Sequence, residues 1–156
     1  MIDSFLNFLT YENIYYIANL GVIPCWLFLI MLPNHIITNF LVKSVIIPLL
    51  LSTAYIFISY QIFIIKNIFE VFNLYLGLDD LYALFSNEAF LLIFWLHFLS
   101  INLFVGNWIV SDAKTYQISK FLVIISLITT YFTGPTGLLI YWMFRIFYSR
   151  KINFYD

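Results

Sequence analysis

The sequence predicts an all-α integral membrane protein, with four transmembrane helices packed into a small bundle. Of its 156 residues, 63% are hydrophobic and only 10% are charged, whereas soluble domains carry about 25% charged residues. The mean hydropathy is +0.97. Four stretches without Asp, Glu, Lys or Arg are also long enough for a helix to cross a bilayer, which takes roughly 20 residues. These three observations together predict the fold class.

The first two spans are predicted at residues 14–32 and 44–65. Pro24 lies inside the first of them, where it removes a backbone hydrogen bond and is expected to bend the helix. Lys43 and Lys66 flank the second span, and their long side chains can extend to the two membrane interfaces. Both stretches are therefore interpreted as complete crossings.

Two further segments are expected to lie in the membrane interface. In residues 67–88, polar groups recur every three or four positions, which places them on one face of a helix: Glu70, Asn73, Gly77 and Asp80. The other face is apolar, so an amphipathic interfacial segment broken at Gly77 is predicted. A short re-entrant segment is the alternative. Residues 3–13 show a similar alternation and are interpreted as a shorter interfacial helix.

The third span, predicted at residues 89–110, is the most informative stretch. A helix of this length reaches roughly 33 Å. Polar groups at membrane depth are costly unless they meet protein or water, so one side of this helix is expected to face something other than lipid. One face carries His97, Ser100, Phe104, Trp108 and Ser111, and another carries Asn102 and Gly106. Asp112 is expected just past the helix end, either solvated or paired with Lys114 or Lys43.

The fourth span is predicted at residues 121–147 and is interrupted by Gly134–Pro135–Thr136–Gly137. Because Pro135 clashes with the preceding turn, the helix is expected to kink or unwind there, in a buried or wet environment. Four spans would place both ends of the chain on one side of the membrane. The Lys and Arg residues then divide four against three, which only slightly favours both ends on the cytoplasmic side. Residues 1–156 are interpreted as a single membrane domain without repeats.

Composition excludes several classes of function. The net charge is −1 and there is no basic tract, so a nucleic-acid partner is not expected. One cysteine and two separated histidines match no metal-site spacing, and no nucleotide-binding or hydrolase motif occurs. The N-terminus lacks the charge pattern of a cleaved leader. Abundant Phe, Tyr, Ile and Asn are typical of A+T-rich genomes, which favours a bacterial inner membrane or an organellar membrane, mitochondrial inner or plastid.

Several motifs of the last two spans resemble the abscisic-acid-deficient-four-like family, which includes plant chloroplast proteins needed to make neoxanthin. The family pattern has a Trp–x–His–Tyr segment, an Asp–Leu–Phe–Val–Gly–x–Trp segment, an Arg–Asp–Ala segment and a Gly–Pro–x–Gly–Leu–Leu segment. The corresponding residues here are Trp95–Leu96–His97–Phe98, Asn102–Leu103–Phe104–Val105–Gly106–Asn107–Trp108, Ser111–Asp112–Ala113 and Gly134–Pro135–Thr136–Gly137–Leu138–Leu139. The resemblance is most specific over residues 94–145.

This resemblance implies a role in carotenoid modification. In plants the reaction isomerises an epoxide into an allene and a hydroxyl, which needs an acid, a base and a long apolar cleft but no redox cofactor. His97 and Asp112 would be the acid–base candidates. The other groups would bind or enclose the substrate: Trp95, Asn102, Phe104, Trp108, Pro135 and Thr136. The expected partners are membrane lipids or a carotenoid, and no cofactor or metal is expected.

Two departures from the family pattern weaken that expectation. The family Asp is Asn102 here, and an amide cannot transfer a proton at neutral pH. The family Arg is Ser111. If the two family charges form a structural ion pair, losing both leaves neither buried alone. The alternative hypothesis is therefore a non-catalytic accessory subunit of a larger membrane complex, for example a respiratory one. A small transporter or channel is the third and least favoured hypothesis.

Overall fold

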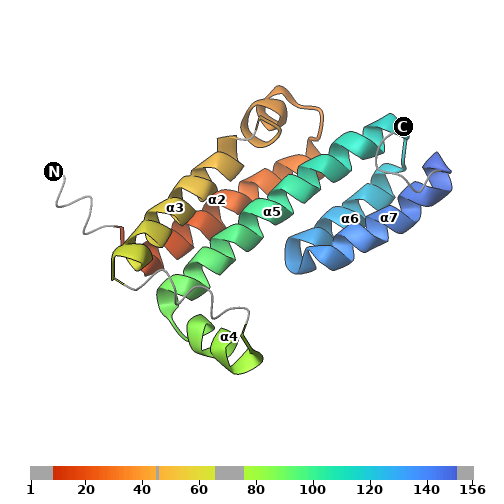
Figure 1. Cartoon of the computed structure of the whole chain (residues 1–156). Coiled ribbons are helices and arrows are strands. Elements are labelled where there is room, and N and C mark those ends of the chain that lie inside the picture. The colour runs from red at the N-terminus through yellow and green to blue at the C-terminus, as the bar shows by residue number, and fades with distance from the viewer. Residues whose placement is uncertain (1–8, 45, 66–75, 151–156) are drawn as a thin grey trace. The chain divides into compact units, whose positions relative to one another are not determined.

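Every secondary-structure element of the described residues, 9–44, 46–65 and 76–150, is helical in the computed structural model (Figure 1). Three of the helices are long and apolar enough to cross a membrane: α2 (Tyr11–Met31), α3 (Ile46–Ile65) and α5 (Glu88–Thr115). They agree with the first three predicted spans. A five-residue π-helical turn, η1 (Thr38–Val42), precedes α3. The membrane class predicted from composition is thus supported by length and apolarity.

Local capping explains where two of these helices begin. The Thr10 hydroxyl accepts a hydrogen bond from the Asn13 amide, 3.2 Å away, at the start of α2. The Asn87 side chain accepts from the Ala89 amide at 3.1 Å at the start of α5. Such caps satisfy amides that have no partner within the helix. Both helices also place a glutamate, Glu12 or Glu88, in the first turn, where the helix dipole favours negative charge.

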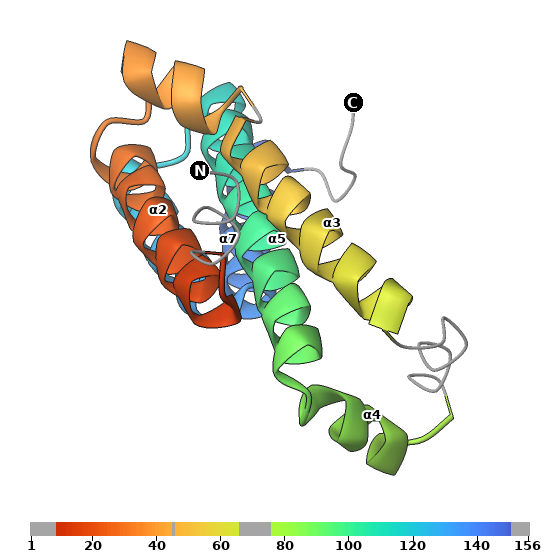
Figure 2. The same ribbon diagram turned by 90° about the vertical axis from the view of Figure 1, so that its left-hand side faces the viewer.

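The predicted interfacial segment is described only in part. Its C-terminal portion forms α4 (Leu78–Phe85), which begins directly after Gly77, where the helical pattern was expected to break. α4 lies at the N-terminal end of α5 (Figure 2) and packs against it through an edge-to-face contact of Phe85 with Phe94. Glu70, Asn73 and most of the N-terminal segment 3–13 lie outside the described residues.

The fourth predicted span is two helices rather than one kinked helix. α6 (Lys120–Thr133) ends at Gly134, and α7 (Pro135–Ser149) starts at the next residue. Gly134 has φ +58°, a left-handed value that glycine adopts without steric cost. The two helices lie side by side and run in opposite directions (Figure 1). A single residue therefore reverses the chain.

Gly137 allows the two helices of this hairpin to approach closely. A side-chain carbon on Gly137 would overlap the backbone nitrogen and the hydroxyl of Thr130, and would lie 2.5 Å from the Thr130 Cα. Small residues are common where membrane helices pack tightly, because they let the backbones meet. α6 has 14 residues and reaches roughly 21 Å, which is less than the thickness of a bilayer core. We therefore predict that the hairpin is re-entrant rather than a complete crossing.

Contacts group the chain into two compact units, residues 1–21 with 49–100 and residues 22–48 with 101–156. In the first unit, the beginnings of α2 and α5 pack together through Asn19 and Trp95. The Trp95 indole donates a hydrogen bond to the Asn19 Oδ1 at 3.1 Å. In the second unit, the end of α5 packs against the α6–α7 hairpin. The single domain inferred over 1–156 stays a prediction.

The hairpin changes the expected membrane topology. If α2, α3 and α5 each cross the membrane and the hairpin does not, we predict that the start of α2 and the end of α7 lie on opposite sides of it. Apart from the buried Arg145, five basic residues then share the side on which α5 ends, against Lys66 alone on the other: Lys43, Lys114, Lys120, Arg150 and Lys151. Since Lys and Arg accumulate in cytoplasmic loops, we predict that α5 ends on the cytoplasmic side.

Cysteine labelling checks this topology in a Cys25→Ala background. Thr10→Cys is expected to react with an impermeant maleimide in intact cells. Asn34→Cys and Arg150→Cys are expected to react only after the membrane is opened. Four complete spans would instead give Thr10→Cys and Arg150→Cys the same accessibility, and that result would contradict the re-entrant hairpin.

Candidate functional site

A buried polar cluster joins the end of α5 to α7 within the second unit. The Arg145 Nε lies 2.8 Å from the Asp112 Oδ2, and the Tyr141 hydroxyl donates to the same oxygen at 2.5 Å. The Arg145 Nη2 donates to the Tyr116 hydroxyl at 3.2 Å. Arg145 and Tyr141 are fully buried. The carboxylate, the guanidinium and the two phenols thus satisfy one another, with Arg145 and Tyr141 fully buried and Asp112 and Tyr116 half-buried.

Helical spacing explains how this polar cluster forms. Asp112 and Tyr116 are four residues apart on α5 and its C-terminal extension, and Tyr141 and Arg145 are four apart on α7, so each pair lies on one helix face. Aromatic rings surround the guanidinium, whose carbon lies 4.7 Å from the Tyr116 ring centroid and 4.9 Å from that of Trp142. Cation–π contacts of this kind stabilise a desolvated arginine.

The predicted position and partners of Asp112 were wrong. Asp112 lies inside α5, which continues to Thr115, and its ion pair is with Arg145 rather than Lys114 or Lys43. Trp108 lies one turn before Asp112 and, like Asp112, contacts α7. Its ring is stacked on that of Trp142, with the centroids 6.1 Å apart, and lies edge-on to that of Tyr141 at 5.5 Å. Trp108 and Asp112 therefore both contact α7, and their roles in a site stay a prediction.

Asn102 meets the turn of the α6–α7 hairpin. Its Oδ1 lies 2.5 Å from the position that a side-chain carbon on Gly134 would take. Asn102 is only 6% exposed, and its Nδ2 has no hydrogen-bond partner among the described residues. Pro135 and Thr136, predicted to line a cavity with Asn102, follow this turn but are both exposed. The structure thus brings the turn to Asn102, while the pyrrolidine and hydroxyl lie at the surface.

His97 lies on an exposed face of α5 rather than in the packed core. The side chains of His97, Phe104 and Ser111 are exposed, and that of Ser100 is half-buried. The imidazole has a ring contact with Tyr55, at 6.5 Å between centroids. His97 and Asp112 are fifteen residues apart on one continuous helix, a separation of roughly 22 Å along its axis. These two acid–base candidates are therefore not brought to one point.

The hypothesis that the two family charges at positions 102 and 111 form an ion pair with each other conflicts with the geometry of α5. Both residues belong to α5 and are nine positions apart. At about 100° per residue, they point in opposite directions and are separated by roughly 13 Å along the axis. Charged residues at these two positions of one helix could not pair directly with each other. The ion pair of this region is formed instead by Asp112 and Arg145.

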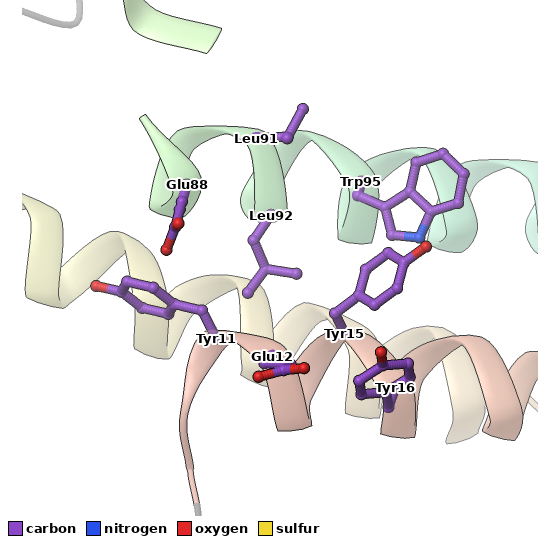
Figure 3. Close-up of a pocket in the computed structure, with 8 residues that line it drawn as sticks. All are labelled: Tyr11, Glu12, Tyr15, Tyr16, Glu88, Leu91, Leu92 and Trp95. Atoms are coloured by element: carbon purple, nitrogen blue, oxygen red, sulfur yellow. The ribbon is translucent and has the colours of Figure 1, made fainter. Parts of the chain in front are cut away.

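A pocket of about 520 Å³ opens at the N-terminal ends of α2 and α5 in the first unit (Figure 3). Its walls come from three tyrosines, two glutamates, two leucines and one tryptophan: Tyr11, Tyr15, Tyr16, Glu12, Glu88, Leu91, Leu92 and Trp95. The Tyr15 and Trp95 rings lie 6.2 Å apart. Glu12 and Glu88 are exposed, so their carboxylates are accessible from the pocket. Trp95 is the one predicted site residue among these walls.

Sequence reasoning missed the other residues of this pocket. The signal available was the cluster Tyr11–Glu12 and Tyr15–Tyr16 around the start of the first predicted span, together with Glu88 directly before the third. Tyrosines are enriched at membrane interfaces, which gives such a cluster an ordinary explanation. Among the described residues, no three His, Cys, Asp or Glu side chains gather as a metal site. The pocket can therefore offer aromatic surface and carboxylate oxygens.

Comparison with protein families gives one match, over residues 13–141, to the model described as ABA4-like, ABA DEFICIENT 4-like. The chain belongs to this family. The ABA DEFICIENT 4-like match confirms the resemblance inferred from the motifs of the last two spans, and it extends over α2 and α3 as well. Comparisons with curated proteins and with solved structures gave no significant match.

Proposed function

We propose that this ABA DEFICIENT 4-like chain binds a carotenoid or a related isoprenoid, and that the pocket at the start of α2 and α5 receives the ring at one end of that ligand. Family membership supports a role in neoxanthin-type chemistry. The pocket volume, about 520 Å³, lies within the usual range for small-molecule sites. It supports a cyclic end group with a few polar atoms rather than an entire polyene.

The walls of the pocket favour such an end group. Trp95 and Tyr15 offer flat apolar surface for ring carbons, and the hydrogen bond from the Trp95 indole to Asn19 holds that ring in place. Glu12 and Glu88 offer oxygens to a hydroxyl or epoxide on the ring. The pocket lies at the starts of two candidate spans, where aromatic residues commonly meet the membrane interface. The oxygenated end groups of a membrane pigment would reach water at the same level.

The same residues could serve an isomerisation. Opening an epoxide to an allene and a hydroxyl moves one proton to the epoxide oxygen and removes another from a neighbouring carbon. Two carboxyl groups that line one pocket can divide these two proton transfers between them. Glu12 and Glu88 are therefore better placed as a pair than His97 and Asp112, which are roughly 22 Å apart along α5.

Pigment analysis in a carotenoid-producing host tests this proposal. The chain is expected to copurify with an oxygenated carotenoid. Trp95→Leu should lower the bound pigment at least fivefold, because it removes both the ring surface and the bond to Asn19. Glu12→Gln and Glu88→Gln should keep the pigment but stop any conversion of epoxide to allene. Asp79→Asn, an exposed acid on α4 outside the pocket, is the matched control and should change neither.

Two outcomes would reject the proposal. No bound pigment and no altered pigment in the host would remove carotenoid binding altogether. A conversion that His97→Ala abolishes while both glutamine variants remain active would move the chemistry away from the pocket, to the exposed face of α5.

The exposed face of α5 supports a second candidate function, that of an accessory subunit. An imidazole and hydroxyls on the surface of a membrane helix are costly against lipid. Coverage of His97, Ser100 and Ser111 by another subunit would remove that cost. Purification under native conditions separates the two functions. A chain found only within a large complex supports the subunit, and a free chain with bound pigment contradicts it.

A further inference from the structure

A second pocket lies in the other unit, where α2 and α5 end and α6 begins. Its volume is about 340 Å³. The walls include Leu29 and Ile30 of α2, Val110 and Lys114 of α5, and Lys120 and Val123 of α6. Apolar side chains therefore form one side of the pocket, and two lysines stand at its edge. These residues have no part in the proposed carotenoid site, which lies at the opposite end of α5.

The lysines of this pocket have no acidic partner in the described part of the second unit. Asp112 is the one acid there, and it is bonded to Arg145 and Tyr141. Lys114 and Lys120 are both exposed and form no ion pair among the described residues. Lys43 lies near enough to Lys114 for their charges to repel each other. The pocket edge therefore carries positive charge that an anion would neutralise.

The backbone adds hydrogen-bond donors to this charge. Lys120 is the first residue of α6, and the side chain of Ser119 before it makes no capping hydrogen bond. The Leu122 and Val123 amides donate to the Ser119 carbonyl, so the amides of the first two residues, Lys120 and Phe121, are the donors that this helix start offers, and the helix dipole attracts an anion to them. An uncapped helix that begins with one lysine, in a pocket lined by a second lysine, has the chemistry of a phosphate site.

The apolar walls of this pocket favour a phospholipid over a free phosphate ion. Leu29 and Ile30 of α2 and Val110 of α5 lie on candidate membrane helices, and Val123 lies on the shorter apolar helix α6. A free phosphate would leave this surface empty, whereas a phospholipid would cover it with acyl chain. We propose that the pocket binds an anionic phospholipid, with the headgroup phosphate between Lys114 and Lys120. The predicted cytoplasmic position of this end agrees, because anionic lipids are concentrated in that leaflet.

Lipid titration of the purified full-length chain, followed by native mass spectrometry, tests the proposal. Phosphatidylglycerol is expected to bind at least tenfold more tightly than phosphatidylcholine. Each lysine near an anionic surface changes binding by about fivefold, so Lys114→Gln with Lys120→Gln should abolish most of this preference. The charge-conserving pair Lys114→Arg and Lys120→Arg should retain it. Arg150→Gln removes an exposed cation outside the pocket, at the end of α7, and should leave it unchanged.

Three results would overturn the lipid site. Equal binding of the two lipids by the unaltered chain would show that the headgroup charge is not recognised. An effect of Arg150→Gln as large as that of the two lysine changes would show a diffuse attraction rather than a pocket. Complete displacement of phosphatidylglycerol by inorganic phosphate alone would show a free-anion site. The first and third tests need no variant, so they hold even if a variant fails to fold.

Discussion

Replacing Arg145 by methionine is expected to destabilise the folded protein by about 3 to 5 kcal/mol, the usual effect of removing one partner of a buried ion pair. The variant leaves the Asp112 carboxylate with Tyr141 but without a cation, and it also removes the bond from Arg145 to Tyr116. Methionine has a similar length, so lost packing contributes little. Unfolding by SDS in mixed micelles measures the change.

The double variant Asp112→Asn with Arg145→Met isolates the role of charge. It removes both ions together, and we expect it to be more stable than Arg145→Met alone, because no buried carboxylate then lacks a partner. Arg150→Met is the control for loss of an exposed cation and should change stability by less than about 1 kcal/mol. An Arg145→Met variant as stable as Arg150→Met would contradict the buried cluster.

Placing alanine at Gly137 is expected to destabilise the α6–α7 hairpin by about 3 kcal/mol, the upper end of the range for overpacking. The new carbon would overlap backbone atoms of Thr130, which cannot rotate away as a side chain could. The two helices would have to separate, and the contact of Asn102 with Gly134 at the turn would loosen with them. Stability in micelles and cleavage near residue 134 by protease both report this opening.

Two other glycines provide graded controls for Gly137→Ala. Gly21→Ala in α2 meets no atom within 4 Å and should be neutral or stabilise by up to about 1 kcal/mol through helix propensity. Gly106→Ala would place its carbon 2.7 Å from the Trp26 ring, a side chain that can shift, so an intermediate loss is expected. If all three variants behaved alike, the close packing of α6 on α7 would be wrong.

Apolar length predicted most of the fold but not the fourth span. The bounds of α2, α3 and α5 differ from the predicted spans by a few residues, because long uncharged runs have few alternatives in lipid. Gly134–Pro135 marked the interruption correctly. Hydropathy cannot distinguish a kinked helix from a reversed one, however, since both have the same composition. The contact of Gly137 with Thr130, two turns apart in a straight helix, decides between them.

The polar cluster shows why site residues were harder to predict than helices. Arg145 is 33 residues from Asp112 in sequence, whereas Lys114 is two residues away. Sequence proximity therefore favoured the wrong partner. Once the chain reverses at Gly134, α7 runs alongside the end of α5 and brings Arg145 to Asp112. Because the reversal at Gly134 was not predicted, the ion-pair partner of Asp112 was predicted wrongly as well.

The shortness of α6 has a consequence for biosynthesis. The chain emerges from the ribosome in sequence order, so α5 enters the membrane before α6 and α7 are made. With 14 residues, α6 is too short to be integrated as a separate crossing. We expect α6 and α7 to enter the membrane together and to pack against α5, which is already inserted. Until that moment Asp112 lacks its cation, so a chain arrested after Ser119 should be a substrate for membrane quality control.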